Sequence, residues 1–201
     1  MNKNLVNESF SHIFNDNEWF NKVLVGGFYV LFVLCGFGIV MINGFIVEFM
    51  KSLLNGNKNM PYWRNFSAIT KTGWKVSLAL ILYYGIATFI LHLMGIHLIS
   101  LETAITYFIL HTTLHPLVLL AYARVQTFSS CFNWKLILQP FQIAADKTIF
   151  TLSVSAVLLF LAITLGWMWI VVGWTLIVFL ALLIQNAMIV LAVKDHLSSH
   201  S

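Results

Sequence analysis

Charged residues are scarce in this chain: only 9% of its 201 residues are Asp, Glu, Lys or Arg, whereas 60% are hydrophobic. A soluble domain carries about 25% charged residues, so this chain has too little polar surface to cover a globule in water. We therefore expect an integral membrane protein in contact with the lipid bilayer. The net charge of +4 is too small to indicate a nucleic-acid partner.

Cysteines and catalytic motifs are also scarce. The two cysteines, Cys35 and Cys131, do not form a Cys-x-x-Cys spacing, and we expect both to be free thiols. The sequence contains no His-Glu-x-x-His, phosphate-binding glycine loop or Gly-x-Ser-x-Gly motif. Its polar segments are too short to fold as separate catalytic domains. These absences predict that the protein is not an enzyme.

The first 22 residues are polar, with scattered aromatic side chains and no apolar core of the kind that signal peptides have. The aromatic spacing fits a short helix on the membrane surface, and equally a frayed tail that becomes ordered only at Trp19. Three regions follow from this pattern. Residues 1–22 form an N-terminal amphipathic segment, 23–193 a single transmembrane domain and 194–201 a polar C-terminal tail.

Long apolar runs occupy most of the remaining chain. They predict membrane spans at 23–50, 76–94 and 101–123, and two more within 149–193 joined by a turn at 166–169. The first run is longer than one crossing needs, and Gly36 and Gly38 in its middle indicate a kink or a reversal. The predicted fold is an all-α, polytopic transmembrane helical bundle. It has five crossings, or six membrane segments if the first span is a broken hairpin.

Most basic residues fall on one side of these spans, at Lys51, Lys58, Arg64, Lys71, Lys75, Arg124, Lys135, Lys147 and Lys194. The opposite loops, 96–100 and 166–169, contain neither Lys nor Arg. Because basic loops stay in the cytoplasm, the loops at 55–64 and 127–135 and the C-terminus are predicted to be cytoplasmic. The N-terminus lies outside if the first span crosses once, and inside if it folds back.

Two amphipathic stretches, 60–75 and 134–147, are predicted to lie along the cytoplasmic surface as interfacial helices. Tryptophan is favoured at that interface, and basic side chains meet anionic lipid headgroups there. The stretches either anchor the spans or also form a docking collar for a partner. The residues of this collar are Pro61, Trp63, Arg64, Lys71, Lys75, Trp134, Lys135 and Lys147.

His111 and His115 lie one helical turn apart and point to one face of the third span. Ionisable groups at that depth usually face the protein interior or a wet cavity, so we expect both rings to face other helices. They are either neutral imidazoles hydrogen-bonded between helices, with no cofactor, or ligands of a haem, chlorophyll or metal. Pro116 frees the carbonyl group of Thr112, which then needs a partner nearby.

Other polar residues of the spans have local explanations. Glu48 lies three residues before Lys51, a spacing that permits an ion pair. Glu102 falls in the first turn of the third span, where a carboxylate complements the helix dipole. The polar side chains expected to hold helices together are Asn43, Gln185 and Asn186.

A pattern of glycine, aromatic and basic residues covers roughly 15–75. It comprises Trp19, Lys22, Gly26-Gly27, Gly44-Phe45, Lys51, Gly56, Met60-Pro61-Tyr62-Trp63 and Gly73. The pattern resembles domain of unknown function family 4013, which occurs in bacterial and archaeal membrane proteins. Glu48 departs from it, since the family often has a basic residue there. The resemblance implies a fold and the cell membrane of a prokaryote, and it implies no chemistry.

Three functions remain open at this point. The first is a non-enzymatic scaffold or accessory subunit of a larger membrane complex, in contact with other subunits or with copies of itself. The second is a small oligomeric transporter or channel module. The third is a haem- or pigment-binding membrane subunit that uses His111 and His115.

Overall fold

A computed structural model describes residues 2–57, 59–97, 99–166 and 171–198. Within these ranges the chain is helical and contains no strand. This confirms the predicted all-α class. The elements are α1 (Asn2–Phe14), α2 (Trp19–Leu31), η1 (Val33–Cys35), α3 (Phe37–Leu54), α4 (Phe66–Leu93), α5 (Leu101–Val125), η2 (Phe128–Phe132), α6 (Trp134–Gly166) and α7 (Val171–Ser198).

Five of the described helices are long and apolar enough to cross a membrane, in agreement with the predicted number of crossings. They are Phe37–Leu54, Phe66–Leu93, Leu101–Val125, Trp134–Thr164 and Gly173–Lys194. The chain is therefore an integral membrane protein. The turn predicted at 166–169 falls largely outside the described residues, which end at Gly166 and resume at Val171.

The first predicted span is two helices and not one long tilted helix. Gly36 has a φ of 73°, a left-handed conformation that favours glycine, and it separates η1 from α3. At Gly38 a Cβ atom would lie 2.2 Å from the carbonyl oxygen of Tyr29. The chain thus breaks at the two glycines that the sequence indicates. The 13-residue α2 is about 20 Å long, too short to cross a bilayer core of about 30 Å.

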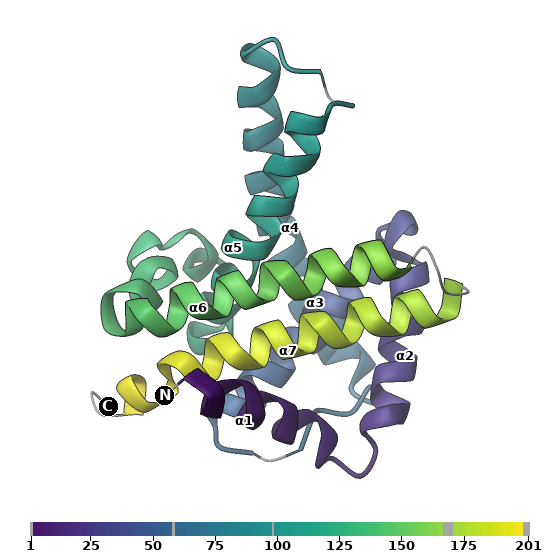
Figure 1. Ribbon diagram of the computed structural model, residues 1–201, viewed down its shortest axis with the longest axis vertical. Coiled ribbons are helices and arrows are strands. Elements are labelled where there is room, and N and C mark those ends of the chain that lie inside the picture. The colour runs from purple at the N-terminus through teal and green to yellow at the C-terminus, as the bar shows by residue number, and fades with distance from the viewer. Residues whose placement is uncertain (1, 58, 98, 167–170, 199–201) are drawn as a thin grey trace.

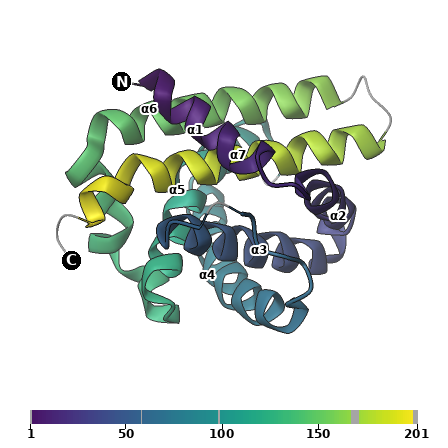
Figure 2. The ribbon, with the colours of Figure 1, turned by 90° about the horizontal axis from the view of Figure 1, so that it is seen from below.

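Helix α7 forms the centre of the molecule. It lies between α6 and α3 and also contacts α1, α2 and α5 (Figures 1 and 2). Most of its side chains from Ala181 to Val193 are buried, in keeping with its strongly apolar sequence. Residues 2–14 are helical as α1, which buries Leu5 and Ile13. The α4–α5 hairpin projects away from the other helices (Figure 1).

The first amphipathic stretch is continuous with a span, unlike the predicted interfacial helix, whereas the second forms a helical segment of its own. Residues 66–75 are the first turns of α4 and continue directly into the span. Residues 134–143 begin α6, and Ala144, with φ −151° and ψ 56°, sets them off from the rest of that helix. Helix α3 ends at Leu54, before a left-handed Gly56.

Candidate functional site

A buried ion pair joins the N-terminal region to the loop before α4. Lys22 of α2 and Asp16 are each 3% exposed, and Lys22 Nζ lies 2.8 Å from Asp16 Oδ2. Lys22 Nζ also donates to the carbonyl oxygen of Met60 at 2.9 Å, and the Met60 backbone N–H donates to Asp16 Oδ2 at 2.7 Å. The pair therefore fixes the 60–65 loop against α2.

The Asp16 carboxyl group is held in its ionised form. Burial raises the pKa of Asp16, but hydrogen bonds from Lys22 and from the backbone N–H groups of Glu18 and Met60 outweigh it. The pKa consequently falls below the ordinary value of 3.8. A buried carboxylate that accepts hydrogen bonds from a lysine and two backbone N–H groups holds these segments of the structure together.

Trp63 is half-buried and packs against neighbouring helices, while its role as an interfacial anchor stays a prediction. Its Nε1–H donates to the carbonyl oxygen of Lys22 at 2.9 Å. Its ring stacks on Phe45 of α3 with centroids 4.1 Å apart and planes 14° apart, and it also lies near Tyr29 and Phe179. The loop held by Lys22 turns the indole toward these helices, where it gains both an acceptor and an aromatic face.

Glycines allow the helices to touch around this loop. A Cβ atom at Gly44 of α3 would lie 2.1 Å from the carbonyl oxygen of Ile69, and one at Gly73 of α4 would lie 1.9 Å from that of Val40. At Gly26 of α2 it would lie 2.0 Å from the ring of Phe179. Close backbone approach of this kind requires small residues. The residues that meet here, which we call the junction, are Lys22, Gly26, Gly44, Phe45, Met60, Trp63 and Gly73.

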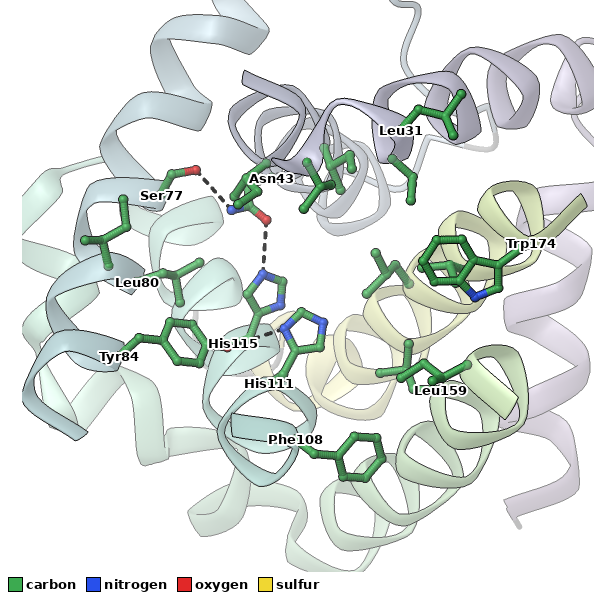
Figure 3. A pocket seen from close by; sticks show the side chains of 18 residues that line it. Leu31, Asn43, Ser77, Leu80, Tyr84, Phe108, His111, His115, Leu159 and Trp174 are labelled. Atoms are coloured by element: carbon green, nitrogen blue, oxygen red, sulfur yellow. Dashed lines mark hydrogen bonds between the residues drawn. The ribbon is translucent and has the colours of Figure 1, made fainter. Parts of the chain in front are cut away.

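A polar chain runs from the junction helices to the histidine pair. His115 is buried, and its Nε2 lies 3.0 Å from Asn43 Oδ1 (Figure 3). Asn43 in turn donates through Nδ2 to Ser77 Oγ at 3.0 Å. Because the amide uses its NH₂ group on Ser77, its oxygen faces His115, and His115 Nε2 carries the proton.

The second histidine pairs with α4. His111 Nδ1 lies 3.3 Å from the hydroxyl group of Tyr84, and the His111 and His115 ring centroids are 4.5 Å apart. Both rings thus face other helices, as predicted from the cost of an imidazole in hydrocarbon.

The carbonyl group freed by Pro116 also has the partner that the sequence requires. Gln185 Nε2 of α7 donates to the Thr112 carbonyl oxygen at 3.1 Å. Asn43 and Gln185 therefore hold helices together as predicted. Asn186 does not, because its Nδ2 donates to the Leu182 carbonyl oxygen one turn earlier in its own helix.

An apolar pocket of about 650 Å³ opens beside the histidine pair (Figure 3). Every helix from α2 to α7 contributes to its wall, and no Lys, Arg, Asp or Glu is among its described lining residues. The polar residues of the lining are Asn43, Ser77, Tyr84, His111, His115 and Trp174. The pocket is therefore suited to an uncharged ligand.

The histidine pair is poorly arranged to hold a haem iron between two imidazoles. His115 Nε2 is engaged with Asn43, and the two rings are adjacent, with planes only 31° apart. Two axial ligands would have to approach an iron from opposite sides. Each ring has one nitrogen without a partner in the described part of the chain, His111 Nε2 and His115 Nδ1, and no group of three metal-binding side chains comes together there.

The remaining predicted collar residues lie in separate places. Arg64, Lys71, Trp134 and Lys135 are exposed, whereas Pro61, Lys75 and Lys147 are half-buried. Trp134 packs on Tyr83 of α4, away from the Phe45 ring against which Trp63 lies.

Two smaller predictions hold. Lys51 Nζ and Glu48 Oε1 form the expected ion pair at 2.7 Å. Both cysteines are free thiols; Cys35 is exposed, and burial raises the pKa of Cys131 to about 11.

Fold and site together define a polytopic α-helical membrane protein with a polar chain inside the bundle. The chain belongs to the family described as protein of unknown function (DUF4013), which it matches over residues 27–172. This confirms the resemblance seen in the sequence. Neither the curated proteins nor the solved structures contain a match to the chain.

Proposed function

We propose that this protein is a non-enzymatic scaffold or accessory subunit of a larger membrane complex, and that it docks through the α4–α5 hairpin. The observation that carries the proposal is the outer half of the hairpin, which stands apart from the other helices (Figure 1). Seven of its large apolar side chains are about half exposed or more in the described part of the chain. They are Ile86, Phe89, Ile90, Leu93, Leu101, Ile105 and Ile109.

Gly85 favours a protein partner over lipid alone. Gly26, Gly44 and Gly73 each lie directly against a neighbouring element, whereas a Cβ atom at Gly85 would meet nothing within 4 Å. A glycine in a helix costs stability relative to alanine. In a membrane helix that cost is offset where the backbone of another helix approaches closely. Gly85 therefore marks a face onto which a further transmembrane helix fits.

The hairpin is built as a unit that needs no further folding on docking. The hydroxyl groups of Thr88 on α4 and Tyr107 on α5 form a hydrogen bond, and the rings of Tyr84 and Tyr107 pack edge to face. Tyr83 also ties α4 to the Cys131 carbonyl oxygen of η2 at 2.9 Å. A preorganised surface of this kind lowers the entropic cost of association.

The non-enzymatic part of the proposal is supported by how the polar side chains are used. Asn43, Ser77 and Gln185 form hydrogen bonds between helices, and Lys22 pairs with Asp16. These hydrogen bonds and the ion pair therefore hold the bundle together.

Substitution of Gly85 by Leu tests the docking face. Because the site is open, the variant should insert and fold as the parent does. The complex purified in mild detergent should have a smaller mass than that of the parent, because the partner no longer binds. Native mass spectrometry measures that mass and shows whether the partner is another protein or a second copy. The matched control is Ser153→Leu, at an exposed small residue on α6. Equal masses for the parent and both variants would refute docking at this face.

A further inference from the structure

The pocket beside the histidine pair opens toward the lipid. Leu31, Ile39 and Ile81 line the pocket and are also exposed on the outer surface. Their side chains are apolar, as is the surface of α4 around them. A molecule that reaches this mouth therefore arrives from the hydrocarbon of the bilayer.

The lining selects an uncharged molecule. With no Lys, Arg, Asp or Glu among the described residues of the wall, a phosphate or carboxylate inside the pocket would meet no permanently charged partner. An unpaired ion in an apolar environment costs many kcal/mol. The volume of about 650 Å³ lies within the range of small-molecule sites and accommodates a head group with part of a tail.

His111 supplies a directed hydrogen-bond donor. Its Nδ1 is paired with the Tyr84 hydroxyl group, and a phenol is a better donor than a neutral imidazole N–H because it is the stronger acid. With Tyr84 donating to Nδ1, the proton of His111 resides on Nε2. Figure 3 shows this second nitrogen turned toward the pocket. It has no partner among the described residues.

Trp174 provides a second donor in the wall. Its Nε1 is buried and makes no hydrogen bond within the described part of the chain. An indole N–H donates only, and a buried donor left unpaired costs about 1–3 kcal/mol. Two of the polar groups that the described lining leaves unpaired, His111 Nε2–H and Trp174 Nε1–H, are thus donors, and the third, His115 Nδ1, is an acceptor. An occupant that satisfies the two donors has to bring oxygen acceptors.

We propose that this pocket binds an uncharged, lipid-soluble molecule whose carbonyl oxygen accepts a hydrogen bond from His111 Nε2–H. Two sources in a membrane share this chemistry: the ring carbonyl of an isoprenoid quinone and the ester carbonyl of a neutral glycerolipid. The site lies between the helices of the bundle, and Phe108 is its one described lining residue from the outer half of the α4–α5 hairpin. The pocket can therefore be tested separately from the proposed docking face.

Titration of the purified full-length protein with decylubiquinone and with dioctanoylglycerol, read by native mass spectrometry, tests the site. At least one probe should bind at a ratio of one to one, and which one binds identifies the source. His111→Leu should weaken binding about tenfold, whereas His111→Gln, which keeps an N–H donor, should stay within about threefold of the parent. His92→Leu, at an exposed histidine outside the pocket, should leave the affinity unchanged.

A rim variant keeps the test independent of any effect on folding. Ile81 is exposed at the mouth, so Ile81→Trp should fold normally and reduce binding by narrowing the entrance. The proposal is overturned if neither probe binds, or if His111→Leu and Ile81→Trp both bind as the parent does. Tighter binding of dioctanoyl phosphatidic acid than of either neutral probe would also overturn it.

Discussion

Lys22 and Asp16 are ionised side chains buried in a chain with few charges, and each depends on the other. Lys22→Met would leave the Asp16 carboxylate buried without its counterion. We expect this change to lower the free energy of unfolding by about 3–5 kcal/mol. Lys51→Met, which breaks a partly exposed pair with Glu48, should cost at most about 1 kcal/mol. Unfolding curves in one detergent measure both, and similar losses would contradict the structural role of Lys22.

Asp16 also makes stability depend on acid. Its pKa is lower in the folded protein than the ordinary 3.8, so the pair stabilises the fold fully above that value. This contribution is lost as the pH falls below 3.8 and through the lowered pKa. The unfolding midpoint should therefore drop in acid, and Asp16→Asn should remove that part of the pH dependence. If the unfolding midpoints of the parent and of Asp16→Asn fall equally as the pH is lowered, this role of Asp16 is contradicted.

Some residue contacts could be predicted from sequence because one local rule dictates them. Pro116 removes the donor that would pair with Thr112, so a partner had to exist, and Gln185 supplies it. The Asn43–His115 bond could not be predicted, because it depends on the register of α3 against α5. The Lys22–Asp16 ion pair could not be predicted either. In the sequence Asp16 looks like the other polar residues around it, and only the fold brings Lys22 beside it.

At the scale of elements, glycine sets how closely helices pack. Gly73→Ala would place a Cβ atom 1.9 Å from the Val40 carbonyl oxygen and force α3 and α4 apart, at a cost of about 1–3 kcal/mol. Gly85→Ala, on the open face of the same helix, should instead raise stability by about 0.5–1 kcal/mol through helix propensity. Thermal unfolding of the two variants in one detergent compares them. The same sign for both would contradict the assignment of Gly73 to the α3–α4 contact.

Helix positions were predictable where hydropathy alone decides them, as in α5 and α7. The break at Gly36 was predictable because glycine is a common site of helix kinks. The start of α4 at Phe66 was missed, since residues 66–75 are amphipathic and polar at several positions. Trp63 was placed at the lipid interface because a tryptophan beside a basic residue is typical of that location. Its contacts with α2 and α3 could not be predicted, because they depend on how the 60–65 loop packs against those helices.

At the scale of the whole molecule, the polar ends of distant segments meet. A Cβ atom at Gly56 would lie 3.9 Å from Lys194 Nζ, so the loop after α3 lies beside the C-terminal end of α7. The basic residues predict that both are cytoplasmic. In a Cys35→Ser background, Asn57→Cys should react with an impermeant maleimide only after the cells are opened. Strong labelling of intact cells would reverse the orientation.

Docking through the α4–α5 hairpin is tested most directly by photo-crosslinking in intact membranes. A benzophenone amino acid replaces Phe89, on the exposed outer half of the hairpin, or Val157, exposed to a similar extent on α6. We predict a discrete protein adduct from position 89 that is absent from position 157 and disappears in a Gly85→Leu background. Docking through the hairpin would be contradicted by lipid adducts alone from both positions, or by a protein adduct at position 89 that persists with Gly85→Leu.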